Sequence, residues 1–198
     1  TFSTSTSVSS NGFTLNWTAA TDDATPTSEL QYLVCSGANI AAIDTVAECE
    51  GATIERTYTA NSTSLAITGK TQATTYYYNV IVKDNAGLKA LYNGLSQATL
   101  ANPPGAPTAV TAVAKNALAN VSWTAPSSNG GSAITDYVIQ YLPNGGAWTT
   151  FNDGTSTATS VTVNGLTNGT TYTFRVAAVN VAGIGAYSSA SAAVTPDG

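Results

Sequence analysis

Apolar and polar side chains alternate with a period of two through most of the chain, as in strands with one buried face. The alternating apolar positions of the first half are Phe13, Leu15, Trp17, Tyr32, Val34, Leu65, Ile67, Tyr76, Tyr78, Val80 and Val82. Those of the second half are Val121, Trp123, Tyr137, Ile139, Tyr141, Val161, Val163, Tyr172, Phe174, Val176 and Ala178. No long segment has the apolar period of a helix. Short strands at regular spacing predict an all-β fold built from sandwiches.

Two stretches of the chain repeat one another. Residues 67–87 align with residues 163–183 without a gap, and eight of the 21 positions are identical. Such repetition indicates tandem copies of one module. Between the copies lies a proline-rich segment, residues 101–107. Proline favours extended backbone, so this segment is typical of a semi-rigid joint. We therefore expect one module over residues 1–100 and a second over residues 101–198.

Composition narrows the class of protein. Of the 198 residues only 9% are charged, against roughly 25% in an average soluble protein, and the formal net charge is −5. The six basic residues form no stripe, which disfavours a nucleic-acid partner. No apolar run approaches the length of a membrane span, so we expect no membrane insertion. The low-charge, Thr- and Ser-rich surface is typical of bacterial secreted or cell-surface modules. If the protein is exported, we expect these residues to be its mature part or an internal piece of a longer chain.

The residues needed for catalysis are missing. The chain has no His, which is the side chain that most often transfers protons near neutral pH and a common zinc or copper ligand. No Lys–Ser or related motif activates a serine. The few carboxylates form no pair with a glycosidase spacing. We therefore expect no enzymatic activity and no cofactor.

Several motifs of the second module are characteristic as a set. Pro104 and Pro107 precede its first strand, and three segments follow, at residues 121–126, 134–141 and 165–172. This combination resembles the fibronectin type III family, and the resemblance extends over nearly the whole chain. It implies two immunoglobulin-like β-sandwiches in tandem. It also implies a tyrosine corner at Tyr172, in which the buried phenol bonds a backbone group a few residues upstream.

The first module resembles the family less closely. Trp17 and Tyr76 keep the places of the core tryptophan and the corner tyrosine, which Trp123 and Tyr172 hold in the second module. Lys70, however, stands where the family usually buries a leucine. We expect its stem to lie along the edge of the core with the ammonium in water, and the corner to be looser.

An insertion distinguishes the first module. The two tryptophans differ by 106 positions and the two corner tyrosines by 96, so about ten extra residues fall near residues 36–56. Cys35 and Cys49 bracket most of them. A redox dithiol, a metal site, two free thiols and a structural disulfide are the alternatives, and the lack of further ligands favours the disulfide. Alternation points Cys35 away from the core, towards an overlying loop. Residues 44–50 could form one helical turn capped by Asp44.

Two further groups of residues are candidates for ligand contact. Asp22, Asp23 and Asp84 lie in loops that meet at one end of the sandwich, where they are either calcium ligands or solvated turn formers, and we favour turn formers. Tyr77 is expected to be the exposed ring of its tyrosine run. Trp148 is either an exposed aromatic that contacts a glycan or protein, or a ring packed on the outside of its own sheet.

These observations favour a non-catalytic function outside the cell. The leading hypothesis is a pair of spacer, presentation or adhesion modules within a larger surface or secreted protein. Its partners would be the neighbouring domains of that protein, together with any protein or glycan ligand on a surface. The alternatives are accessory linker modules of a secreted polysaccharide-degrading enzyme, and a structural component of a virion or filament.

Overall fold

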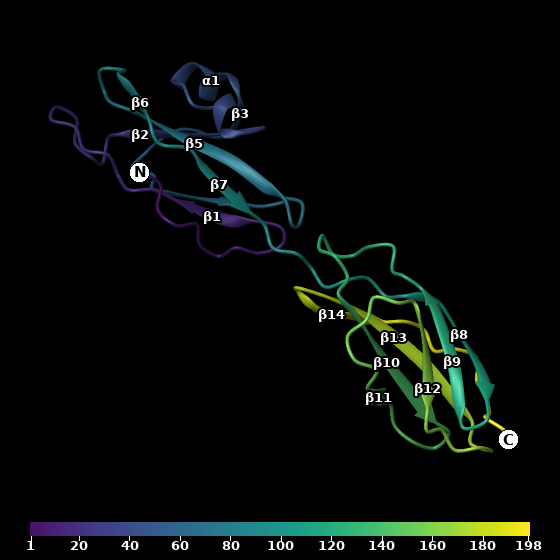
Figure 1. The fold of residues 1–198 in the computed structure, drawn as a ribbon. Helices are drawn as coiled ribbons and strands as arrows, with labels where there is room; N and C mark the ends of the chain where they lie inside the picture. The colour runs from purple at the N-terminus through teal and green to yellow at the C-terminus, as the bar shows by residue number, and fades with distance from the viewer. The chain divides into compact units, whose positions relative to one another are not determined.

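The computed structural model describes residues 1–198 and separates them into two compact units, Thr1–Leu100 and Ala101–Gly198 (Figure 1). All strand pairs in both units are antiparallel. The prediction of an all-β chain with two immunoglobulin-like sandwiches is confirmed. No helix is long and apolar enough to cross a membrane.

The first unit contains a small sheet and a large one. In the small sheet β1 (Phe13–Asn16) pairs with β4 (Ser64–Ile67). The large sheet has the order β3-β2-β5-β6, and β7 also pairs with β5. Its strands are β2 (Gln31–Gly37), β3 (Thr53–Ala60), β5 (Thr75–Lys83), β6 (Lys89–Leu91) and β7 (Leu95–Ala98).

The core of the first unit lies between these sheets and follows the period of two. Its buried members are Phe13, Leu15, Trp17, Leu30, Tyr32, Val34, Ile67, Tyr78 and Val80. Trp17 packs against Tyr32 with ring centroids 6.1 Å apart. The alternation of apolar and polar side chains along each strand therefore predicts which face of the strand lies in this core.

The inserted residues form a layer on the other face of the large sheet. This layer contains the 3-10 turn η1 (Ile40–Ala42) and the short helix α1 (Val46–Gly51), on the side of the sheet away from β1 (Figure 1). The helix does not begin as expected, because its N-cap is Thr45 and not Asp44. The Thr45 hydroxyl accepts from the Glu48 amide while the Glu48 carboxylate accepts from the Thr45 amide, so two unpaired donors are satisfied by a capping box.

The second unit is a sandwich of three and four strands. One sheet has the order β12-β9-β8 and the other β11-β10-β13-β14. The strands are β8 (Thr108–Lys115), β9 (Leu118–Thr124), β10 (Asp136–Pro143), β11 (Thr149–Phe151), β12 (Ser160–Asn164), β13 (Tyr172–Asn180) and β14 (Gly183–Tyr187). Trp123 lies in the core and packs edge-on against Tyr137, with ring centroids 5.2 Å apart.

The proline-rich segment is bound along the second unit. The Asn102 amide donates to the Gly130 carbonyl at 2.8 Å, and the Gly105 amide donates to Ser128 at 2.9 Å. The Asn180 side chain donates to the Asn102 carbonyl at 2.8 Å. Pro104 is buried. The segment is therefore part of the second sandwich and does not behave as a loose tether.

Candidate functional site

A disulfide between Cys35 and Cys49 fastens the inserted layer to the large sheet. Their Cα atoms are 5.5 Å apart and neither residue is exposed. Together with Leu33, Ile43 and Ile81 they form a second apolar cluster outside the main core. Cys35 does point away from that core, towards the inserted layer, and no cysteine is left free.

Polar contacts fasten the end of the same layer. The Glu50 carboxylate accepts from the Lys89 ammonium at 2.6 Å and from the Tyr58 hydroxyl at 2.8 Å, and these bonds hold the pKa of Glu50 below its usual value. The Lys83 ammonium lies 4.3 Å from the Tyr58 ring centroid. Tyr77 is half-buried against the outer cluster, so the expectation of an exposed ring is wrong. The reason is the inserted layer, which covers the face where Tyr77 points.

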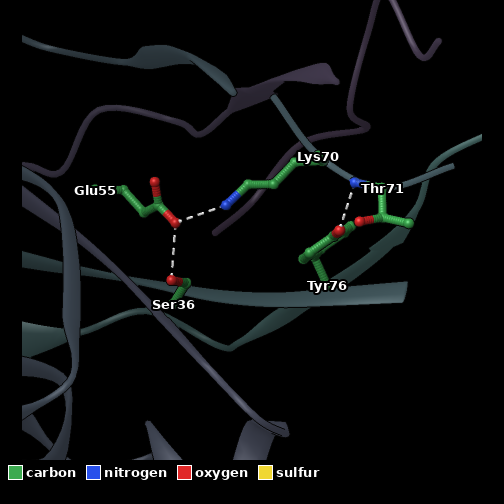
Figure 2. Close-up of polar contacts among 5 residues, drawn as sticks. All are labelled: Ser36, Glu55, Lys70, Thr71 and Tyr76. Atoms are coloured by element: carbon green, nitrogen blue, oxygen red, sulfur yellow. Dashed lines mark hydrogen bonds and ion pairs between the residues drawn. The ribbon is translucent and has the colours of Figure 1, made fainter. Parts of the chain in front are cut away.

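Both corner tyrosines bond the backbone just upstream. The Tyr172 hydroxyl accepts from the Thr167 amide at 3.1 Å, and the Tyr76 hydroxyl accepts from the Thr71 amide at 2.8 Å (Figure 2). Tyr172 is 6% exposed, whereas Tyr76 is half-buried, although we expected both to be buried. In each corner the hydroxyl is the acceptor, so its removal leaves a backbone donor unpaired.

Lys70 is held more firmly than we expected. Its ammonium lies 3.0 Å from the Glu55 carboxylate, which also accepts from Ser36 at 2.8 Å (Figure 2). It also lies 5.2 Å from the Tyr76 ring centroid. The side chain is 20% exposed, so the expectation of an ammonium in water is wrong. The reason is Glu55 of β3, because its carboxylate places a negative charge next to the Lys70 ammonium at the edge of the core.

The three loop aspartates are not gathered into one cluster of potential metal ligands. Asp22 accepts from the Ala24 amide at 3.0 Å and from the Thr25 amide at 2.6 Å, which lowers its pKa. Asp84 accepts from the Leu88 amide at 2.8 Å. Asp22, Asp23 and Asp84 belong to no group of three or more potential metal ligands. Two of them thus act as the turn formers that Asp commonly provides.

Trp148 packs on the outside of its own sheet. The Arg175 guanidinium lies 4.2 Å from the centroid of the Trp148 ring and 4.3 Å from that of Tyr187. Arg175 also donates to the Gln140 side chain at 2.9 Å. One face of the indole is therefore covered by a cation, which leaves less of it for a ligand. The alternation of β13 places Arg175 between two core residues, so the sequence indicates that Arg175 faces outward but not which rings it contacts.

Sequence reasoning missed a pocket at one end of the first unit. It has a volume of about 240 Å³ and is called the loop pocket below. Its lining residues are Ala20, Thr21, Asp22, Leu30, Val82, Asp84, Leu88, Lys89 and Ala90. It combines an apolar floor with two carboxylates. The signal for it lay in the differences between the two repeats at these positions.

Comparisons with known proteins agree with this architecture. The family model described as fibronectin type III domain matches residues 102–194. Chitinase A1 of Niallia circulans is 36% identical over 187 residues, which cover 90% of this chain and 23% of that protein. Protein turtle of Drosophila melanogaster is 34% identical over 111 residues, or 56% of this chain and 7% of that protein. The chain thus spans less than a quarter of either relative.

A solved structure supports the fold of both units. Domains A168–A170 from titin align with 93% of this chain and 57% of their own, with a TM-score of 0.58. The sequence identity is 20%, so this likeness shows the fold alone. Residues 102–194 match the fibronectin type III family model, and the chain folds as a tandem of two fibronectin type III-like β-sandwiches.

Proposed function

We propose that this chain is a non-catalytic pair of extracellular spacer modules that separates neighbouring domains of a longer protein. The way the backbone is anchored around residue 101 carries the proposal. The Leu100 amide donates to Ser9 at 2.9 Å and its carbonyl accepts from Ala73 at 3.0 Å, within the first unit. From Asn102 onward the backbone is bonded within the second unit. Only Ala101 lies between the two sets of bonds, so few torsions remain to reorient the units.

The disulfide supports the extracellular part of this proposal. Disulfides persist in oxidising compartments and are rare in the cytosol. The Cys35–Cys49 bond lies in a dedicated layer with its own apolar cluster, so its role is structural. Modules that present neighbouring domains must stay folded, and such a bond stabilises the folded state.

Similarity to Chitinase A1 favours a second, more specific version. Because 90% of the chain aligns with a part of that protein, we propose that the spacer belongs to a secreted polysaccharide-degrading enzyme. The modules would set the distance between the parts of the enzyme that bind and cleave the substrate. They would themselves contribute no proton donor or nucleophile.

Distance measurements test the spacer function. We expect nitroxide labels at T63C and T157C, both at exposed positions, to give one narrow distance distribution in pulsed electron resonance. Four Gly/Ser residues inserted after Ala101 add a flexible reach of about 11 Å and should broaden it strongly. The same insertion after Gly145, in an exposed turn inside the second unit, should leave it unchanged. Native and inserted chains of equal width would contradict the proposal.

Retention on insoluble polysaccharide separates a spacer from an adhesive module. We expect the isolated chain to pass through chitin without retention, because Arg175 covers one face of Trp148. Retention that disappears in W148A but persists in W17F, a core change in the other unit, would instead favour direct glycan binding.

A further inference from the structure

Six asparagines of the chain are followed directly by glycine. They are Asn11, Asn93, Asn129, Asn144, Asn164 and Asn168. In such a pair the glycine amide nitrogen can attack the side-chain carbonyl carbon of the asparagine, because glycine has no Cβ to obstruct the approach. Ring closure also requires that the side chain and the backbone of the pair can rotate. The six pairs have the same two residues, so their surroundings in the folded chain decide which of them reacts.

The pair at Asn129 is held at both reacting groups. The side-chain oxygen of Asn129 accepts from the Gly131 amide at 3.0 Å. The Gly130 amide, which would be the nucleophile, donates to the Ser128 hydroxyl at 3.3 Å, and Gly130 is buried. Both hydrogen bonds must break before the ring can close, so the fold protects this pair.

The pair at Asn168 is held in the same way. The Asn168 side chain accepts from the Ala117 amide at 2.8 Å and donates to the Asn116 side chain at 2.9 Å. The Gly169 amide donates to the Pro196 carbonyl at 2.9 Å. Reaction at this pair would break all of these hydrogen bonds, so it is protected as well.

Three further pairs are restrained by packing or by strand pairing. Gly12 is buried. Gly94 is half-buried, and a Cβ placed on it would stand 2.7 Å from the Ile40 side chain. Asn164 pairs with Leu118 in the sheet, and this pairing fixes its backbone torsions. In each of these pairs at least one residue is therefore restrained.

The turn at Asn144 differs from these five places. It joins β10 to β11, and both Asn144 and Gly145 are exposed. A hydrogen bond from the Gly146 amide to the Pro143 carbonyl at 2.9 Å closes the turn. Neither the Asn144 side chain nor the Gly145 amide takes part in that bond. Gly145 has a φ of 78°, and a Cβ placed on it would meet no atom within 4 Å. The pair is therefore open to solvent and uncrowded.

We propose that Asn144 is a site of spontaneous succinimide formation and that it converts before the other asparagine–glycine pairs. The Gly145 nitrogen forms a bond to Cγ of Asn144, the Cγ–Nδ2 bond breaks, and ammonia leaves with the amide proton. Water then opens the succinimide at either carbonyl, which gives aspartate or isoaspartate. The product carries a new negative charge in the turn that leads to Trp148. Isoaspartate also lengthens the backbone of this turn by a methylene group.

Mass spectrometry of peptides from the aged protein tests the proposal. The folded chain is incubated in mildly alkaline buffer, and the conversion of each asparagine is followed by the mass gained when the amide becomes an acid. We expect Asn144 to convert about ten- to a hundred-fold faster than Asn129 and Asn168, because two or more hydrogen bonds must break at the protected pairs. Co-elution with synthetic peptides separates aspartate from isoaspartate.

Unfolding supplies the matched control. In guanidinium chloride all six pairs lose their surroundings, so their rates should become similar, and those of Asn129 and Asn168 should rise most. N144Q should abolish the early product, because closure of the larger ring is slower, and at an exposed position it should leave the fold unchanged. The proposal is overturned if native Asn144 converts no faster than Asn129 and Asn168, or if the same ranking persists in the unfolded chain.

Discussion

Reduction of the Cys35–Cys49 disulfide is expected to lower the free energy of unfolding of the first unit by about 3 kcal/mol and to leave the second unit unchanged. The bond closes a loop with a sequence separation of 14, and a loop of this length corresponds to about 3 kcal/mol in the chain-entropy model. Without the bond, the inserted layer should also cover Leu33 and Ile81 less tightly, because these side chains belong to the same buried apolar cluster as both cysteines.

Calorimetry of the whole chain measures this effect, since each unit should give its own transition. The transition of the first unit should fall by about 12–24 °C, because 1 kcal/mol shifts a domain of this size by about 4–8 °C. The double variant C35S/C49S should behave like the reduced protein. T45A, which removes the capping box of the same layer, should cost only about 1 kcal/mol. A shift of both transitions, or of neither, would show that the bond does not act on the first unit alone.

Tyr172→Phe is expected to cost the second unit about 1–3 kcal/mol, because it leaves the Thr167 amide without its acceptor in a partly buried turn. Tyr76→Phe should cost the first unit less. The Thr71 amide lies at an exposed site, so water can replace the lost hydroxyl. Because the Lys70 ammonium is bonded to Glu55, we expect Lys70 to contribute little to this difference.

Separate denaturation of the two units, each with its Tyr→Phe change, measures the difference. Tyr141→Phe is the matched control, because that ring packs 6.0 Å from Tyr172 while the Thr167 amide of the corner donates to the Tyr172 hydroxyl. It should cost little. A loss in the first unit equal to that in the second would mean that exposure of the Thr71 amide does not decide the outcome.

The sequence by itself determined the sheets and the cores. Alternation is a local property, since successive side chains of a strand point to opposite faces. It therefore identified Trp17 and Trp123 as core residues, and it predicted that Cys35 points away from the main core. The repeat at an offset of 96 added the tandem arrangement, because two similar sequences favour the same fold. The absence of His directed the hypothesis towards non-catalytic functions.

Only the tertiary structure decided how side chains far apart in sequence pair with one another. Glu55 meets Lys70 across 15 positions, and the Arg175 guanidinium lies close to the rings of both Trp148 and Tyr187. Neither pairing is visible in a periodic pattern, because each depends on which strands lie side by side. The loop pocket arises in the same way, since its lining comes from segments about 60 positions apart. Long-range packing, which no local pattern encodes, therefore set the chemistry of the surfaces.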